Sequence, residues 1–236
     1  MLPDEHCKVV IAHIRHSMMS KAMHVSYATD KCFLLRENLI RSATQCREDA
    51  ALLSPVQNRQ YSLMNNIRRA EGEKKEQSQE RRRLMLLREQ YRLTGAMQQQ
   101  LDDTAAGLMR SADALLFTLL KAQHYQWRDQ LYMAVLTGES DSVLPAERDC
   151  PLGQWLYGEG KRRFRALPGY SALQECHYDI HKVTPGLSGS GPAEMSPRVL
   201  SETLQRVEDL SQRLIAALES LDTWVGLLYP EEVTGQ

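Results

Sequence analysis

The chain has 236 residues, 29 of them basic and 30 acidic, so its formal net charge is −1. Hydrophobic residues make up 42% and charged residues 25%, a composition that indicates a folded, soluble protein and excludes disordered and collagen-like chains. The balanced charge argues against the basic surface of nucleic-acid-binding proteins, so we expect no nucleic-acid partner. Glycine, proline and aromatic residues are few, and the common residues favour helices. The composition therefore predicts an all-α protein.

The first residues of the chain and its cysteines point to a cytoplasmic location. Met1-Leu-Pro-Asp-Glu-His lacks the basic and apolar regions of a secretory signal, and no run approaches the ~18 apolar residues that a membrane span needs. The chain has five cysteines, an odd number, and their spacing does not resemble a disulfide framework. We expect a cytoplasmic protein without a membrane partner, in which the cysteines are buried thiols, metal ligands or reactive thiolates.

The N-terminal half has the pattern of a helical hairpin. A first helix can begin at Pro3-Asp4, with a weak break near Thr29-Asp30. Ser54-Pro55-Val56-Gln57 combines a capping serine, a proline at the first helical position and a capping-box glutamine. The sequence therefore predicts that two helices meet near residues 51–54 and form an antiparallel hairpin.

No proline follows Pro55 until Pro145, which predicts a long second helix that ends at Gly138. Its stretch from Arg68 to Arg92 mixes both charges and is typical of a solvated helix face, although Arg81 to Arg83 could contact an acidic partner. A heptad-like seam then follows at Leu84, Leu87, Tyr91, Thr94, Gln98, Leu101, Ala105, Leu108, Ala112, Leu115, Leu119 and Ala122. This spacing favours a coiled coil, either in a homodimer or in a long helix packed on the N-terminal hairpin.

A second stripe begins where the seam ends and predicts a separate helical bundle. Its members are Leu116, Leu120, His124, Trp127, Leu131 and Val135. A short helix can begin at Pro151 and end at Gly158 or Gly160, another helix fits Tyr170 to Val183, and Pro185 to Pro197 is expected to be a loop. Ser196-Pro197 begins a final helix. Residues 113–230 are thus expected to form a four-helix bundle, and residues 1–112 a helical hairpin or coiled-coil region of unknown function.

Four residues of this predicted bundle have the chemistry of a metal site. His177 and His181 are four residues apart in a helical segment, so both imidazoles project from one face. His124 lies on the inward stripe of another helix, and Cys150 lies at a helix start. One thiolate and three imidazoles from three segments match a tetrahedral zinc site.

The residues His124-Tyr-Gln-Trp127, Cys150-Pro-Leu-Gly-Gln-Trp155 and His177-x-x-x-His181 resemble the chemoreceptor zinc-binding (CZB) domain of bacteria. The resemblance covers about residues 113–230 and is closest to the CZB domain of a zinc-regulated diguanylate cyclase. It implies a four-helix bundle in which His124, Cys150, His177 and His181 bind Zn²⁺. Neither a cyclase motif nor a chemoreceptor signalling hairpin is recognisable in the sequence.

The sequence favours a regulatory function over catalysis. Four protein ligands close a zinc site, and the residue after His177 is Tyr178, so the glutamate of H-E-x-x-H metalloproteases is absent. We therefore expect no enzyme, but a zinc-binding sensory protein of bacterial signal transduction, in chemotaxis or cyclic-di-GMP regulation. Zinc occupancy or oxidation of Cys150 would alter helix packing, and the helix of His124 would pass the change to the N-terminal half or to a protein partner that carries the output. A homodimer is expected, and the alternative is a scaffold or adaptor whose zinc is only structural.

Overall fold

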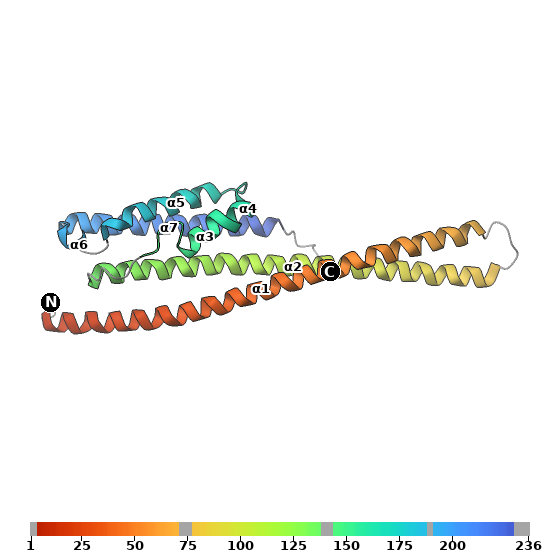
Figure 1. The fold of residues 1–236 in the computed structure, drawn as a ribbon, viewed down its shortest axis with the longest axis horizontal. Coiled ribbons are helices and arrows are strands. Elements are labelled where there is room, and N and C mark those ends of the chain that lie inside the picture. The colour runs from red at the N-terminus through yellow and green to blue at the C-terminus, as the bar shows by residue number, and fades with distance from the viewer. Residues whose placement is uncertain (1–3, 71–76, 138–143, 188–190, 229–236) are drawn as a thin grey trace, which may run out of the picture. The chain divides into compact units, whose positions relative to one another are not determined.

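The structure, a computed structural model, describes residues 4–70, 77–137, 144–187 and 191–228 (Figure 1). All regular secondary structure within these ranges is helical, which confirms the all-α prediction. No helix in the described ranges combines the length and the apolar character that crossing a membrane would require.

The helices fall into two compact units. In chain order they are α1 (Asp4–Ala70), α2 (Gln77–Thr137), α3 (Pro151–Trp155), the π-helix η1 (Leu156–Gly160), α4 (Lys161–Phe164), α5 (Tyr170–Val183), the 3₁₀ helix η2 (Thr184–Leu187), α6 (Gly191–Glu194) and α7 (Pro197–Leu227). The first unit combines residues 1–36 with residues 113–236, and the second unit is residues 37–112. Both long helices, α1 and α2, contribute to both units. The functional division into residues 1–112 and 113–230 stays a prediction.

The hairpin of two long helices is confirmed, but its predicted turn is wrong. Helix α1 continues through Thr29-Asp30 and through Pro55 and ends at Ala70, and α2 begins at Gln77. A proline inside a helix removes one hydrogen bond and costs about 3 kcal/mol, so packing has to offset it. The Ser54 hydroxyl does not cap a helix but accepts a hydrogen bond from Gln98 Nε2 on α2, at 3.2 Å. Contacts across the hairpin thus override the local signal for a helix start.

The second unit is an antiparallel pair of helical segments with few fully buried residues. The rings of Tyr61 and Tyr91 lie 6.4 Å apart, and Gln60 Nε2 donates to the Thr94 hydroxyl at 3.4 Å. Its buried apolar residues are Ala43, Ala50, Leu84, Ala105 and Ala112. Three of these, Leu84, Ala105 and Ala112, belong to the predicted seam, which in this unit therefore packs on α1 of the same chain. The predicted homodimer stays a prediction.

The first unit has two apolar cores. Helices α5 and α7 lie side by side, and α2 provides apolar residues to both cores (Figure 1). One core gathers large side chains from α2, α3, α5 and α7, among them Phe117, Trp155, Leu173 and Leu218, and Phe33 of α1 packs against it. The other core contains Trp127, Leu131, Ile180, Val207 and Leu210. Cys150 and Cys176 belong to the first core and Trp127 to the second, so the candidate site lies at the border between them.

Two predicted connections are wrong in detail. The short helix from Pro151 does not end at Gly158 or Gly160 but continues through the π-helix η1 into α4. Gly158 has φ −98° and ψ −105°, which bends the segment, and a Cβ on Gly160 would lie 3.1 Å from the indole of Trp155. The predicted loop from Pro185 to Pro197 includes the short helices η2 and α6, since prolines are tolerated in first helical turns. Residues 188–190 of that loop lie outside the described residues.

Candidate metal centre

Cys150 lies at the start of α3, where the backbone of the preceding loop packs closely against the first turn of the helix. It is the N-cap residue, and its Sγ accepts a hydrogen bond from the backbone N–H of Gly153 at 3.2 Å. A Cβ on Gly153 would lie only 1.9 Å from the Glu147 carbonyl oxygen, so this position requires glycine. The Cys-Pro-Leu-Gly sequence thus fixes the direction of the thiol: proline begins the turn, and glycine lets the preceding loop close over it.

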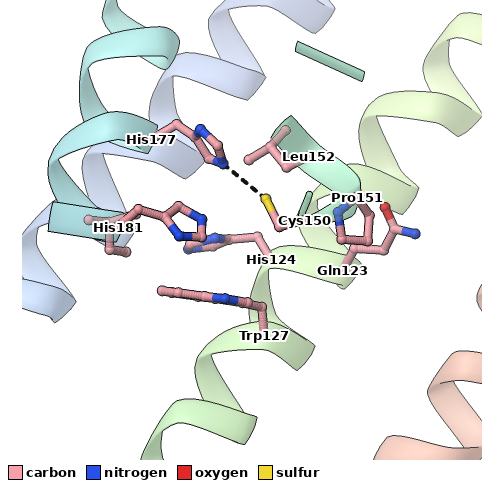
Figure 2. A pocket seen from close by; sticks show the side chains of 9 residues that line it. Gln123, His124, Trp127, Cys150, Pro151, Leu152, His177 and His181 are labelled. Atoms are coloured by element: carbon pink, nitrogen blue, oxygen red, sulfur yellow. Dashed lines mark hydrogen bonds between the residues drawn. The ribbon is translucent and has the colours of Figure 1, made fainter. Parts of the chain in front are cut away.

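Helix α5 supplies the two histidines of the H-x-x-x-H pattern. Their ring centroids lie 4.8 Å apart, as expected for residues one helical turn apart. His177 Nε2 lies 3.1 Å from Cys150 Sγ (Figure 2). His177 is almost fully buried, and its Nδ1 has no hydrogen-bond partner within the described parts of the chain.

His124 of α2 lines the same cavity but has a different hydrogen-bond partner. Its Nε2 lies 2.8 Å from the hydroxyl of Ser211 on α7. Its ring stacks on Trp127 at 5.9 Å, and the indole of Trp127 lies 5.0 Å from the ring of His181. Figure 2 shows the three imidazoles and the thiol turned toward one another from α2, α5 and the start of α3. Trp127 thereby forms an apolar wall beneath the histidines.

Burial favours the neutral forms of both the histidines and the cysteine. Burial lowers the pKa of His124 to about 4 and that of His177 to about 3, and it also lowers the pKa of His181. All three imidazoles are therefore neutral near pH 7, which is the form that donates a lone pair to a metal. Burial raises the pKa of the Cys150 thiol, partly offset by the N–H groups of Gly153 and Leu152. A bound divalent cation would reverse that effect, because it favours the thiolate.

The size of the cavity and its donor atoms fit one zinc ion. Cys150, His177 and His181 each offer a ligand atom, and these atoms lie within 4.8 Å of one another. Tetrahedral zinc, with bonds of about 2.0 to 2.3 Å, holds its ligand atoms roughly 3.5 Å apart, so small side-chain movements suffice. The cavity has a volume of about 20 Å³, enough for a single ion or water.

The structure thus brings three of the four sequence-predicted ligands into one cluster and places His124 on the wall of the same cavity. Cys176, the neighbour of His177 in sequence, lies in an apolar core. Sequence reasoning missed Ser211, whose only local signal is a serine on the apolar face of the last helix between Leu210 and Leu214. A buried hydroxyl at such a position indicates a hydrogen-bond partner on a facing helix.

The comparison with known families agrees with the geometry. Residues 124–184 match the family model of the chemoreceptor zinc-binding domain, about a quarter of the chain. The match begins at His124 and includes Cys150, His177 and His181. Neither the curated proteins nor the solved structures gave a match to the chain. The likeness to the CZB domain of a diguanylate cyclase stays a prediction. The expected resemblance is confirmed: residues 124–184 match the model of a zinc-binding domain, and Cys150, His177 and His181 within them could hold the expected zinc ion.

Proposed function

We propose that this protein is a zinc-responsive regulatory protein in which the metal state of Cys150 changes the packing of the two long helices. His124, Cys150, His177 and His181 would hold the ion, and the bound ion would neutralise the thiolate and join α2, α3 and α5. Four protein ligands leave no open position for a reacting water, so the proposed role is regulation and not catalysis.

The observation that carries this proposal is a network of ion pairs that joins the segment after Cys150 to both long helices. The helical segment that begins after Cys150 leads into η1, where Glu159 accepts a hydrogen bond from Arg36 of α1 at 2.8 Å. Glu159 also pairs with Arg163 at 2.8 Å, and Arg163 binds both carboxylate oxygens of Asp113 on α2, at 2.8 and 2.6 Å. The Arg36 side chain is 6% exposed and that of Asp113 1%, so both ends of the network are buried.

The two ends of the network lie where the long helices leave the first unit. Arg36 is the last residue of α1 in that unit, and Asp113 is the first residue of α2 in it. A shift of α3 and η1 on zinc release would therefore act on both helices just before they enter the second unit. A π-helix, which is less stable than an α-helix, is a suitable element for such a shift.

We propose that the protein is a homodimer in the cytoplasm. A partner protein that carries the output would bind to the second unit. Apolar side chains follow one another along α2 at a 7, 4 spacing and are exposed: Leu86 at 63%, Leu93 at 52% and Met97 at 57%. Such a stripe is typical of a helix that packs against another helix. A second copy or an output protein of chemotaxis or cyclic-di-GMP signalling would cover it. Light scattering of the intact protein, and of Leu93→Glu, would report the dimer.

Hydrogen exchange of the intact protein tests the proposed transmission. Zinc addition to chelator-treated protein is expected to change the exchange of residues 84–112 in the second unit. In Glu159→Gln, zinc affinity should stay within about threefold of wild type, while the change in residues 84–112 should fall below half, because one neutral amide replaces a carboxylate shared by two arginines. Glu202→Gln is the matched control, since Glu202 pairs with Arg198 on the exposed surface of α7. An equal response in wild type and Glu159→Gln would contradict the transmission model.

The alternative is a scaffold in which zinc is only structural. The buried ligands and the 20 Å³ cavity are compatible with a permanently bound ion. That role predicts that chelation unfolds the first unit, whereas a sensor keeps a folded metal-free state. A chelator titration followed by circular dichroism and metal analysis would distinguish the two functions.

A further inference from the structure

His124 and Ser211 form a buried hydrogen-bonded pair at the metal cavity. His124 Nε2 on α2 lies 2.8 Å from the Ser211 hydroxyl oxygen on α7. Ser211 is fully buried and His124 is 4% exposed, so water does not compete for this bond. His124 lines the metal cavity, whereas Ser211 is not among the described residues that line it. Ser211 therefore contacts His124 from outside the cavity, on a helix that carries none of the four proposed zinc ligands.

The position of His124 decides whether the site has a fourth ligand. Cys150, His177 and His181 offer ligand atoms within 4.8 Å of one another, and His124 lines the same cavity without joining that cluster. Its ring is held on two sides, by the hydrogen bond to Ser211 and by stacking on Trp127, with the ring planes 21° apart (Figure 2). A ring that is already fixed loses less conformational entropy when it binds a metal.

The hydrogen bond to Ser211 also selects the nitrogen of His124 that can bind a metal. A neutral imidazole has one N–H group and one lone pair. Since Nε2 is paired with Ser211, Nδ1 is the nitrogen that remains for a cation, whereas His177 approaches Cys150 through its Nε2. With the proton on Nε2, His124 donates to the Ser211 oxygen and keeps the Nδ1 lone pair free. Metal-binding histidines commonly donate their second ring N–H to an oxygen in this way.

The Ser211 hydroxyl is itself held by a charged pair. Arg128 NH1 donates to the Ser211 oxygen at 3.4 Å and to a carboxylate oxygen of Glu208 at 2.9 Å. Arg128 lies one helical turn after His124 on α2, and Glu208 lies three residues before Ser211 on α7. A hydroxyl oxygen has two lone pairs, so it can accept from Arg128 and from His124 at the same time.

We propose that Ser211 is a positioning residue of the metal centre: it accepts a hydrogen bond from His124 Nε2 and thereby presents His124 Nδ1 as the fourth zinc ligand. The inference rests on the proposed binding of zinc by His124, but not on the proposed transmission to the second unit. It adds α7 to the helices that zinc binding joins, through a hydrogen bond and not through a metal bond.

Zinc affinities of the intact protein, measured by competition with a chromophoric chelator, test the positioning role. Ser211→Ala should lower the affinity about tenfold to a hundredfold. The same change made in His124→Ala should alter the affinity by less than about threefold, because Ser211 acts only through His124. Ser220→Ala, at a half-buried position of the same helix, is the matched control and should leave the affinity unchanged. An equal loss from Ser211→Ala with and without His124 would overturn the proposal.

Long-range ¹H–¹⁵N spectra of the histidine rings test the choice of nitrogen in the intact, zinc-loaded wild-type protein, and therefore do not depend on the folding of a variant. The ring signals of His124 can be assigned through their contacts with Trp127. They are expected to show a proton on Nε2 and a metal-bound Nδ1. Zinc on Nε2 of His124, or a proton on its Nδ1, would overturn the proposal.

The variants also separate failure of this inference from failure of the proposed zinc site. If His124→Ala binds zinc as tightly as the wild type, His124 is not a ligand, and the proposed ligand set and this inference both fail. If His124→Ala loses affinity while Ser211→Ala retains it, the ligand set stands and only the role of Ser211 is refuted.

Discussion

The two units differ in what fills their interiors. The first unit buries large side chains such as Phe117, Phe164 and Leu156, whereas the described buried apolar residues of the second unit are four alanines and Leu84. Small facing residues allow two helices to approach closely but bury little area, and burial of apolar area is the main source of stability. The first unit therefore has the more stable interior.

Both units expose large apolar side chains. The second unit exposes Leu52 at 69%, Met85 at 69% and Leu86 at 63%, and the first unit exposes Met23 at 73% and Leu34 at 66%. The chemistry-bearing residues, by contrast, are all in the first unit, with Cys150 4% and His177 1% exposed. The two units therefore differ in their interiors and in the placement of the candidate metal ligands, and not in the exposure of apolar side chains.

The largest expected effect is the loss of zinc affinity on removal of the Cys150 thiol, and the stability of the second unit should not change. In Cys150→Ala we expect zinc affinity to fall about a thousandfold, because loss of an outer-shell partner alone costs ten- to a hundredfold and this change removes a ligand. Cys176→Ala is the matched control, since Cys176 is buried in an apolar core of the same unit. Competition with a chromophoric chelator measures both affinities. Equal loss in the two variants would show that the effect is a general disturbance of the core.

Gly153→Ala should destabilise the first unit by about 3 kcal/mol. The added Cβ would meet the Glu147 carbonyl oxygen at 1.9 Å, and backbone cannot yield as a side chain does. Urea unfolding followed by tryptophan fluorescence measures this unit alone, because Trp127, Trp155 and Trp224 all lie in it. Unchanged stability would mean that the loop before Cys150 does not hold the thiol in place.

The sequence predicted the parts of the molecule that depend on neighbouring residues. The helix from Tyr170 to Val183 is confirmed to the residue, and the spacing of His177 and His181 follows directly from it. The pattern Ser-Pro, however, occurs twice with different outcomes. Ser196 caps α7 by accepting from the N–H of Val199, whereas Ser54 accepts from Gln98 across the hairpin. The local sequence could not distinguish them, because the difference comes from a helix more than 40 residues away.

The parts of the site that join distant segments were not predictable. The pair Arg36–Glu159 joins residues 123 positions apart, and the pair His124–Ser211 joins residues 87 apart. Nothing in the sequence around Arg36 distinguishes it from the other arginines of a solvated helix, since its burial depends on the position of η1. The metal residues were found because cysteine and histidine are rare and have a characteristic spacing, which does not hold for arginine and serine.

Acid should destabilise the metal-free first unit through its buried histidines. The pKa values of His124 and His177 are lowered to about 4 and about 3, whereas both titrate near 6.5 in the unfolded chain. Between pH 6.5 and 4 the unfolded chain therefore binds protons that the folded unit does not, and the free energy of unfolding falls as the pH falls. At pH 5 the loss is roughly 2 kcal/mol for each histidine.

Urea unfolding at pH 7 and pH 5 in the presence of chelator, followed by tryptophan fluorescence, measures this loss. His177→Gln should remove a large part of the pH dependence, and His124 and His181, whose pKa values are also lowered, should account for the rest. His13→Gln, at an exposed position of α1 away from the metal residues, is the control substitution. A stability that is independent of pH in this range would show that the imidazoles are solvated and protonate freely in the folded unit.

The smallest expected effect is a stabilisation of the second unit, whereas the changes above destabilise the first unit or weaken zinc binding. Gly107 is inside α2, and a Cβ added there would meet no atom within 4 Å. Gly107→Ala should therefore stabilise the hairpin by up to about 1 kcal/mol, through the lower conformational entropy of the unfolded chain. Thermal unfolding followed by circular dichroism at 222 nm should shift upward, while the transition seen by tryptophan fluorescence stays in place. If both transitions moved together, the units would unfold as one, and the difference in stability inferred from their interiors would not hold in solution.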